Sequence, residues 1–187
     1  MKPQRIKTLL KIHFTFLVIS ILNSLSKNFT PYSLEGNLEF VIKLLVILSG
    51  ITLFFYHLKP FKKINTYFSI YILAGIFFII GLLFRGIPGA IIISIIIFPI
   101  IPNNKKYENN GIIISAPFQG FMAPCLTYQI KERKFLIFEK NYGVFELDEG
   151  GPIDFESICI EQSESGIEVT YTTVFDEGIV KKKRINR

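Results

Sequence analysis

Apolar residues dominate the first hundred positions of the chain in four long runs, which short polar stretches separate. A membrane-spanning helix needs about 20 mostly apolar residues to cross a hydrocarbon layer about 30 Å thick. Backbone groups that face lipid must be paired within their own segment, so these runs are expected to be helical. The pattern therefore predicts a membrane α-helical region of about four transmembrane helices, at residues 8–25, 38–58, 67–84 and 87–101.

The fourth run is shorter than the others and holds Pro99, which removes a helical hydrogen bond. Pro102 and the asparagines that follow it end the run. It either spans the membrane along a thin or tilted path, which we favour, or forms a re-entrant or interfacial hairpin.

Basic residues are divided unevenly between the two sides that four crossings would define. Nine of them lie before or at the start of the first run, between the second and third runs, and after the fourth. The opposite loops hold Lys27 and Arg85, or three basic groups if Lys43 is counted. Short cytoplasmic loops collect Lys and Arg. We therefore expect the N-terminus and the C-terminal module to face the cytoplasm, in a bacterial inner (plasma) membrane.

The first run also fits a second interpretation. Its basic start, apolar stretch and small residues at Ser24 and Ser26 are shared by secretory signal peptides, which are cleaved from the mature protein. No Ala-x-Ala pattern is present, and Lys27-Asn28 does not open a soluble domain, so we favour a retained helix.

From Gly111 onward the period changes to short runs of Ile, Val, Phe, Tyr and Thr between turn residues, which is typical of β-strands. In residues 167–175 apolar side chains alternate with Glu and Thr, as in an antiparallel sheet with one buried face. We expect hairpin loops at 140–143 and 163–166 and a turn at 148–151. The candidate strands are 112–116, 126–131, 134–139, 143–147, 153–161, 167–175 and 178–182. The sequence thus predicts a membrane region at 1–102 and a small, soluble, antiparallel all-β domain, barrel-like or roll-like, at 103–187, with a basic C-terminal tail.

The stretch from Gly151 to Glu161, followed by a hairpin into Ile167–Val174, resembles the pleckstrin-homology-like domains that some bacterial membrane proteins carry after helical hairpins. The resemblance covers about a fifth of the chain and implies a small barrel or roll. The fold of that family closes with a helix, whereas this chain finishes in the basic stretch Lys181–Arg187. No functional residue is carried over from the family.

The net charge of the chain indicates a partner only when the two halves of the sequence are counted separately. The 187 residues carry a net charge of +6 and have a mean hydropathy of +0.41. Residues 1–102 hold ten basic and two acidic groups, whereas residues 103–187 hold 11 basic and 13 acidic groups. The positive charge thus flanks the apolar runs, and membrane topology explains it better than nucleic acid does. We expect the lipid bilayer as a partner, with a protein or a second copy as further candidates and no nucleic acid.

Ionisable groups within the apolar runs are the first candidates for function. Glu39 and Lys43 stand four residues apart in the second run, the spacing of a helical ion pair. Both lie close to the predicted outer boundary, so we favour an interfacial pair over an ion or proton relay. His13 and His57 lie near the inner boundary and are expected to be interfacial residues rather than metal ligands.

Small residues recur every four positions in the fourth run and occur also in the third. This spacing lets two helices approach each other closely. The short turn between the runs favours packing within the chain over a homodimer or a partner subunit. The helix-packing candidates are Gly75, Gly81, Gly86, Ala90 and Ser94.

The β-rich half offers little chemistry. It contains no histidine, so a Ser-His-Asp, Cys-His or His-metal site cannot be built within it. Cys125 and Cys159 are isolated and are expected to be core thiols in a reducing cytoplasm. The acidic pairs at 148–149 and 176–177 could hold a cation but are typical of solvated turns. We expect no catalytic residue, no cofactor and no metal.

Two segments of this half could contact lipid. Lys181, Lys182, Lys183 and Arg184 form a basic cluster that could bind anionic headgroups with about 1 kcal/mol per charge. The apolar loop Pro117–Pro124 could pack under the sheet, which we favour, or dip into the bilayer.

These patterns favour a non-enzymatic integral membrane protein whose β-domain binds a protein partner or the membrane surface. One alternative is a membrane-embedded immunity or assembly protein that acts through its helices. A weaker alternative is a transporter or channel subunit that uses Glu39, Lys43 and Arg85.

Overall fold

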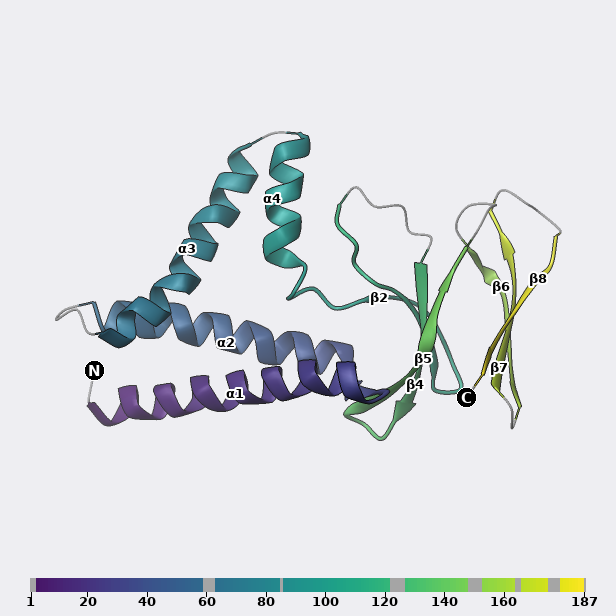
Figure 1. The fold of residues 1–187 in the computed structure, drawn as a ribbon, viewed down its shortest axis with the longest axis horizontal. Coiled ribbons are helices and arrows are strands. Elements are labelled where there is room, and N and C mark those ends of the chain that lie inside the picture. The colour runs from purple at the N-terminus through teal and green to yellow at the C-terminus, as the bar shows by residue number, and fades with distance from the viewer. Residues whose placement is uncertain are drawn as a thin grey trace. The chain divides into compact units, whose positions relative to one another are not determined.

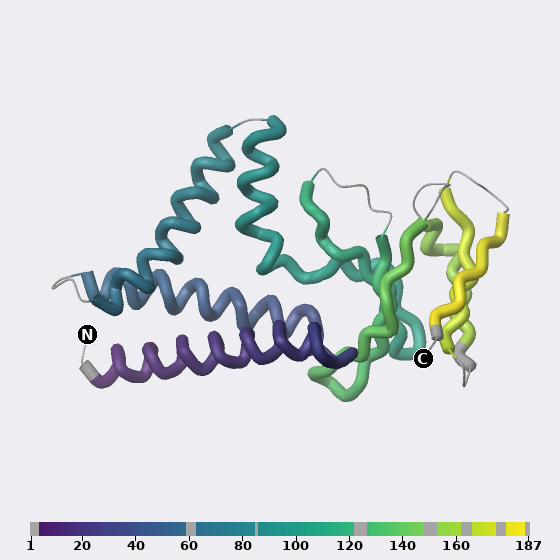
Figure 2. Tube along the Cα trace, viewed as in Figure 1, coloured from purple at the N-terminus to yellow at the C-terminus, as the bar shows by residue number. Residues whose placement is uncertain are grey.

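The computed structural model describes residues 3–58, 63–84, 86–121, 127–147, 153–163, 166–174 and 179–186. The chain divides into two compact units, one helical and one β-rich (Figures 1 and 2). The helical unit consists of Met1–Ser26, Gly36–Pro102 and Gln119–Met122. The β-rich unit consists of Lys27–Glu35, Asn103–Phe118 and Ala123–Arg187. The connection between the first two helices therefore belongs to the β-rich unit.

Four helices are found among the described residues: α1 (Pro3–Phe29), α2 (Gly36–Tyr56), α3 (Lys63–Leu83) and α4 (Ile87–Ile97). By length and composition, the first three could cross a membrane. The 11 residues of α4 extend over about 16 Å, roughly half of a hydrocarbon layer about 30 Å thick. The expectation of four apolar helices is confirmed, but α4 is too short to span as a helix. It ends early because Pro99 has no amide hydrogen to continue it, and residues 98–100 form turns.

Eight strands are found in the described part of the chain, and they form two antiparallel sheets. The five-stranded sheet has the order β1-β5-β4-β3-β2, and the three-stranded sheet has the order β6-β7-β8. The expectation of a small antiparallel all-β module is confirmed, but the two sheets do not close into a barrel. The strands are β1 (Tyr32–Leu34), β2 (Asn104–Asn109), β3 (Ile112–Ala116), β4 (Thr127–Lys134), β5 (Phe138–Glu146), β6 (Ile153–Ser163), β7 (Gly166–Thr173) and β8 (Lys181–Asn186).

The core of the β-rich unit lies between the two sheets. Ile114, Ile130 and Phe145 of the five-stranded sheet belong to one apolar cluster with Val169 and Tyr171 of β7. The predicted alternation in β7 is confirmed, because the apolar positions are buried and the Glu and Thr positions between them are partly exposed. Period-two alternation is what turns one face of a strand into the core.

The positions of several strands differ from those expected. The predicted hairpin loop at residues 140–143 lies inside β5, and the true turn is at residues 135–137. The ladder register shifts after Ile130, so that Lys131 lies opposite Asn141. The turn-like residues around Gly143 therefore make a bulge and not a loop. The predicted connection at 163–166 does join two strands, β6 and β7. The turn expected at 148–151 lies outside the described residues.

β1 is the strand that the sequence analysis missed. It lies in the short connection between α1 and α2, and it pairs antiparallel with β5 so that Ser33 lies opposite Glu139. Glu35 N donates to Ile137 O at 2.9 Å, and Asn141 N donates to Pro31 O at 2.7 Å, which extends the ladder at both ends. The sheet thus includes a segment that precedes most of the apolar chain.

This pairing does not fit the expected topology. With four crossings, the connection before α2 and the C-terminal module would face opposite sides of the membrane. Two strands exchange backbone hydrogen bonds only when they are on the same side. The expectation that the N-terminus and the β-module share the cytoplasmic side is therefore incompatible with the β1–β5 ladder when α1 crosses the membrane.

We expect a disulfide between Tyr32→Cys and Lys140→Cys in a chain whose two native cysteines are replaced by serine. The hydrogen bonds on either side make these register partners a non-hydrogen-bonded pair. The Cα atoms of such a pair are about 4.5 Å apart, within disulfide range. A mobility shift on non-reducing gels of whole membranes measures the cross-link.

The matched control combines Tyr32→Cys with Glu146→Cys. Glu146 lies on the same strand, six residues beyond Lys140 and so about 20 Å away. Equal cross-linking in the two pairs would contradict the register, and so would its absence from both.

Candidate functional site

The close contact between α3 and α4 is made at two glycines. A Cβ at Gly81 would lie 2.8 Å from Ile93 Cγ1, and a Cβ at Gly89 would lie 1.8 Å from Phe84 O. Gly89 is thus the position at which one backbone touches another. The sequence analysis did not select it because it lies outside the four-residue repeat of small residues.

The other packing candidates have different surroundings. A Cβ at Gly75 or Gly86 would meet no described atom within 4 Å. Gly86 instead has a φ of +82°, which glycine adopts without strain. Ala90 is half-buried, and Ser94 Oγ accepts a hydrogen bond from Phe121 N at 3.2 Å. Of the predicted glycines, Gly81 is the one whose missing side chain lets α4 approach.

Glu39 and Lys43 form an ion pair near the start of α2. Lys43 Nζ lies 2.5 Å from Glu39 Oε1, and the two side chains are partly exposed. The charges therefore neutralise each other within two turns of the helix start. This geometry suits an interfacial pair, the interpretation favoured from the sequence.

A buried polar network that the sequence analysis did not identify joins α1, α2 and α3. His13 is fully buried within the protein. Its Nδ1 lies 2.9 Å from Ser49 Oγ, and its Nε2 lies 3.0 Å from Tyr67 Oη. Tyr67 Oη lies in turn 2.8 Å from Tyr71 Oη. A Cβ at Gly50 would lie 2.6 Å from the Tyr71 ring, so this glycine makes room for the tyrosine.

The direction of these hydrogen bonds follows from the backbone carbonyl at one end of the network. Ser49 Oγ lies 2.6 Å from Leu45 O, which can only accept. The Ser49 hydroxyl therefore donates to the backbone and accepts from the Nδ1–H of His13, which leaves Nε2 to accept from Tyr67. The network links three helices. The sequence signal was the presence of polar side chains within three apolar runs.

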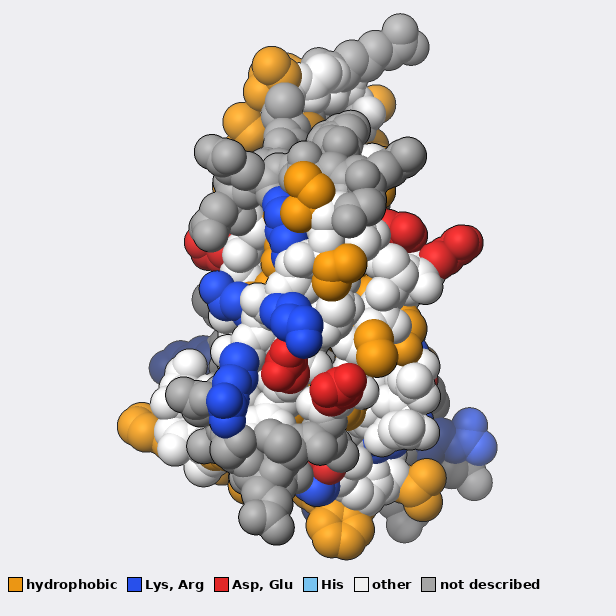
Figure 3. Space-filling model, turned by 90° about the vertical axis from the view of Figure 1, so that its right-hand side faces the viewer, with side chains coloured by type: hydrophobic (Ala, Val, Ile, Leu, Met, Phe, Trp, Pro, Cys, Tyr) orange, Lys and Arg blue, Asp and Glu red, His pale blue; other side chains and the backbone are white. Residues whose placement is uncertain are grey.

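The basic cluster Lys181–Arg184 lies in β8 and not in a tail. Lys182 Nζ lies 3.0 Å from Glu168 Oε1 on the neighbouring β7, and this carboxylate raises the pKa of the Lys182 ammonium. Figure 3 shows Lys and Arg side chains beside acidic ones on this face of the molecule. Lysines on an edge strand oppose pairing with the strands of other chains. The cluster is thus part of a mixed-charge sheet surface.

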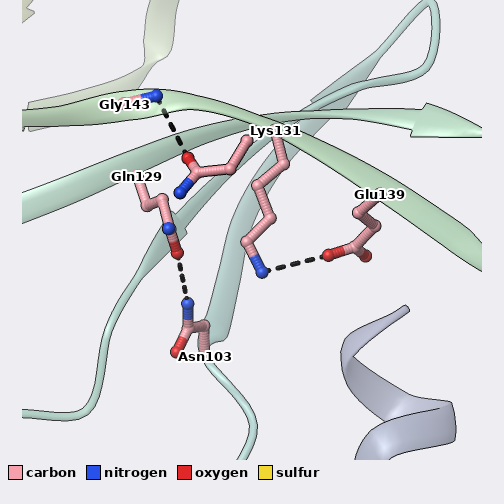
Figure 4. A network of polar contacts seen from close by, with 6 residues as sticks. Asn103, Gln129, Lys131, Glu139 and Gly143 are labelled. Carbon is pink, nitrogen blue, oxygen red and sulfur yellow. Dashed lines mark hydrogen bonds and ion pairs between the residues drawn. The ribbon is translucent and has the colours of Figure 1, made fainter. Parts of the chain in front are cut away.

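A second polar network lies on β4 and β5, on the sheet face opposite the core (Figure 4). Lys131 Nζ lies 3.0 Å from Glu139 Oε2, and the two side chains are 10% and 5% exposed. Asn103 Nδ2 donates to Gln129 Oε1 at 2.7 Å. Asn141 Oδ1 accepts from Gly143 N at 3.0 Å, which fastens the bulge in β5. The buried Lys131–Glu139 ion pair is therefore surrounded by the side-chain amides of Asn103, Gln129 and Asn141.

A cavity of about 180 Å³ opens beside this network. Its walls come from the segment around β1 and from the polar face of β4 and β5. It is smaller than the cavities of about 300–1,000 Å³ that hold drug-sized ligands. Its walls hold amides, hydroxyls and two lysine side chains, of which Lys131 is already paired with Glu139. The polar walls include Lys27, Thr30, Ser33, Asn103, Gln129 and Lys131.

The described residues contain no group of three or more His, Cys, Asp or Glu side chains that could hold a metal ion. The acidic pairs at 148–149 and 176–177 and Cys125 lie outside the described part of the chain. Cys159 is exposed on β6, so the expectation of a buried core thiol at this position was wrong. Its side chain points away from the core because β6 alternates about the buried Ile158.

Comparison of the chain with protein-family models, with curated proteins and with solved structures finds no match. A functional proposal therefore rests on the structure of the chain itself.

We expect Gly89→Ala to destabilise the helical unit, because the new methyl group would overlap Phe84 O. Overpacking of this kind costs about 1–3 kcal/mol. Gly75→Ala is the matched control, since its methyl group meets open space and alanine favours a helix. Thermal unfolding in detergent should show a lower midpoint for the first variant and no loss for the second. Equal midpoints would contradict the close approach at Gly89.

We expect Lys131→Met or Glu139→Leu alone to destabilise the β-rich unit by about 3–5 kcal/mol, because each removes one member of the buried ion pair and leaves the other charge buried. The double variant Lys131→Met/Glu139→Leu should recover most of this loss. Lys182→Met, which breaks an exposed pair, should have little effect. Denaturant unfolding measures all four variants, and additive losses in the double variant would contradict a coupled pair.

Proposed function

We propose that the protein is a non-enzymatic integral membrane protein whose β-rich unit binds a protein partner at the membrane surface. The observation that carries this proposal is the pairing of β1 with β5. β1 is separated from α1 by Thr30 and Pro31 and from α2 by Glu35 alone. The two ends of β1 are thus joined to membrane-length helices by connections of one or two residues.

We further propose that α1, α2 and α3 cross the membrane and that α4 returns without crossing. This arrangement puts the connection that contains β1 and the β-rich unit on one side and the N-terminus on the other. Basic residues then divide seven to four in favour of the N-terminal side, which makes that side cytoplasmic. The β-rich unit would lie outside the plasma membrane of a bacterial cell. The seven are Lys2, Arg5, Lys7, Lys11, Lys59, Lys62 and Lys63, and the four are Lys27, Arg85, Lys105 and Lys106.

We expect a membrane-impermeant maleimide to label Cys159 in intact cells that carry a Cys125→Ser chain, because this thiol is exposed on β6. Moving the single thiol to the N-terminal helix, with Cys159→Ser and Lys7→Cys, should make labelling depend on permeabilised cells. Labelling at position 7 but not at 159 in intact cells would contradict the proposed orientation.

A photo-cross-linking residue in place of Glu161, on the outer face of β6, tests the binding function. We expect one discrete cross-linked protein, and we expect Lys182→Glu/Arg184→Glu on the same face to remove it. The matched control places the cross-linker at Leu82, which is exposed on α3. A discrete product from position 82 alone, or from neither position, would contradict a partner on the β-rich unit.

The buried His13 network favours a second candidate, in which the protein acts through its helices as an assembly or immunity protein or conducts protons. A chain of hydrogen bonds through apolar helices is a potential proton path. Proton flux into liposomes that contain the protein tests this candidate. Flux that His13→Phe abolishes and His57→Phe preserves would favour it, and absence of flux in the wild-type chain would exclude conduction.

A further inference from the structure

The turn between β4 and β5 carries the most exposed apolar side chains among the described residues. Phe135 and Leu136 are 86% and 91% exposed, and Ile137 and Phe138 are 47% and 41% exposed. Monomeric soluble proteins scatter exposed apolar residues singly, so four in a row at a hairpin tip indicate a contact surface. We call residues Phe135–Phe138 the apolar tip.

The turn itself does not require these residues. Phe135 has a φ of +59°, in the left-handed region that favours glycine or asparagine. Three-residue hairpin loops usually have glycine at such a position. An aromatic residue therefore occupies this site against the preference of the backbone, and its exposure means that internal packing does not explain it.

The backbone of the apolar tip is bonded to the residue that precedes α2. Glu35 N donates to Ile137 O at 2.9 Å, and Leu34 lies opposite Phe138 in the ladder. α2 begins at the next residue, Gly36. A helix that crosses a membrane starts at the boundary between water and hydrocarbon. Glu35, and the tip bonded to it, therefore lie at that boundary.

Charge changes abruptly at the base of this hairpin. Lys134 Nζ lies 2.6 Å from Glu132 Oε1, and Lys131 pairs with Glu139 on the opposite strand. The charges that flank the apolar tip are thus paired within the sheet, and the tip itself carries none. This division suits a segment whose base stays among hydrated headgroups while its end enters a less polar layer.

We propose that the apolar tip inserts into the interfacial layer of the lipid bilayer, beside the start of α2. Aromatic side chains are favoured in this layer. Insertion stops there, because the unpaired amides of a loop do not enter the hydrocarbon core. This inference rests on the proposed crossing by α2. It adds a lipid contact that holds the β1–β5 edge of the sheet on the membrane.

The test uses the full chain, with both native cysteines replaced by serine, in vesicles of phosphatidylethanolamine and phosphatidylglycerol. An environment-sensitive fluorophore is attached at Leu136→Cys. Lipids with a spin label near the headgroup should quench this probe, and aqueous iodide should quench it at least threefold less than a probe at Val180→Cys. Val180 is 60% exposed before β8 in the other sheet, which makes it a matched apolar control.

Quenching of the Leu136 probe by iodide as strong as at Val180 would overturn the proposal. Shielding from both quenchers would also overturn it, because a protein or a second copy would then cover the tip. A probe at Leu48→Cys, exposed near the middle of α2 and tested with lipids that carry the spin label deep in the acyl chain, reports separately on membrane crossing by α2. If lipid quenches it but not the Leu136 probe, this inference fails alone; if lipid quenches neither, membrane crossing by α2 fails as well.

A second variant keeps the turn and removes part of the apolar surface. Phe135→Gly suits the positive φ at this position, so the hairpin should stay folded. We expect iodide access to the Leu136 probe to rise at least twofold in this background. Unchanged access would contradict a role of Phe135 in insertion.

Discussion

Backbone hydrogen bonding between β1 and β5 is the interaction on which the architecture depends. β1 is short, and its connections to α1 and α2 are shorter still. The strand covers the β5 edge of the five-stranded sheet, which would otherwise offer a row of open donors and acceptors. The same few bonds thus complete the sheet with a segment that comes from the connection between α1 and α2.

Two buried polar networks place charged or hydrogen-bonding groups at positions that apolar residues could also fill. Hydrogen bonds between helices in a membrane contribute about 0.6 kcal/mol on average, and replacing a buried ion pair by apolar residues is often neutral. The His13 network and the Lys131–Glu139 pair therefore add little net stability. We expect their effect to be on specificity, since each pairs polar groups at one relative position of the elements that it joins.

Much of the architecture followed from periodicity in the sequence. Uninterrupted apolar runs predicted the helices, and strict alternation predicted β7. Both patterns reflect which side chains of an element are kept from water. β1 was not predicted, because three residues between two helices are too few to show a period. The β4–β5 turn was misplaced, because the apolar residues Phe135, Leu136 and Ile137 are typical of a strand. The residues of the bulge at Asn141–Gly143 are typical of a turn.

The candidate sites were harder to predict, because they depend on distances between segments far apart in the chain. Glu39 and Lys43 were found because a helix sets the distance between positions four apart. Gly89 was missed because its importance comes from the carbonyl of Phe84, which no repeat reveals. His13, Ser49 and Tyr67 come from three helices, and nothing in a one-dimensional pattern brings them together.

The ladder between β1 and β5 also has a consequence for biosynthesis. Residues 32–34 leave the ribosome long before their partners at 138–140 have been made. Until then the edge that β1 completes does not exist, and the nascent chain carries an unpaired segment between two apolar helices. Since contacts this distant in sequence form late and slowly, the sheet is completed only after β5 has been made. A prematurely terminated chain would expose that segment, which gives proteases a means of telling finished molecules from aborted ones.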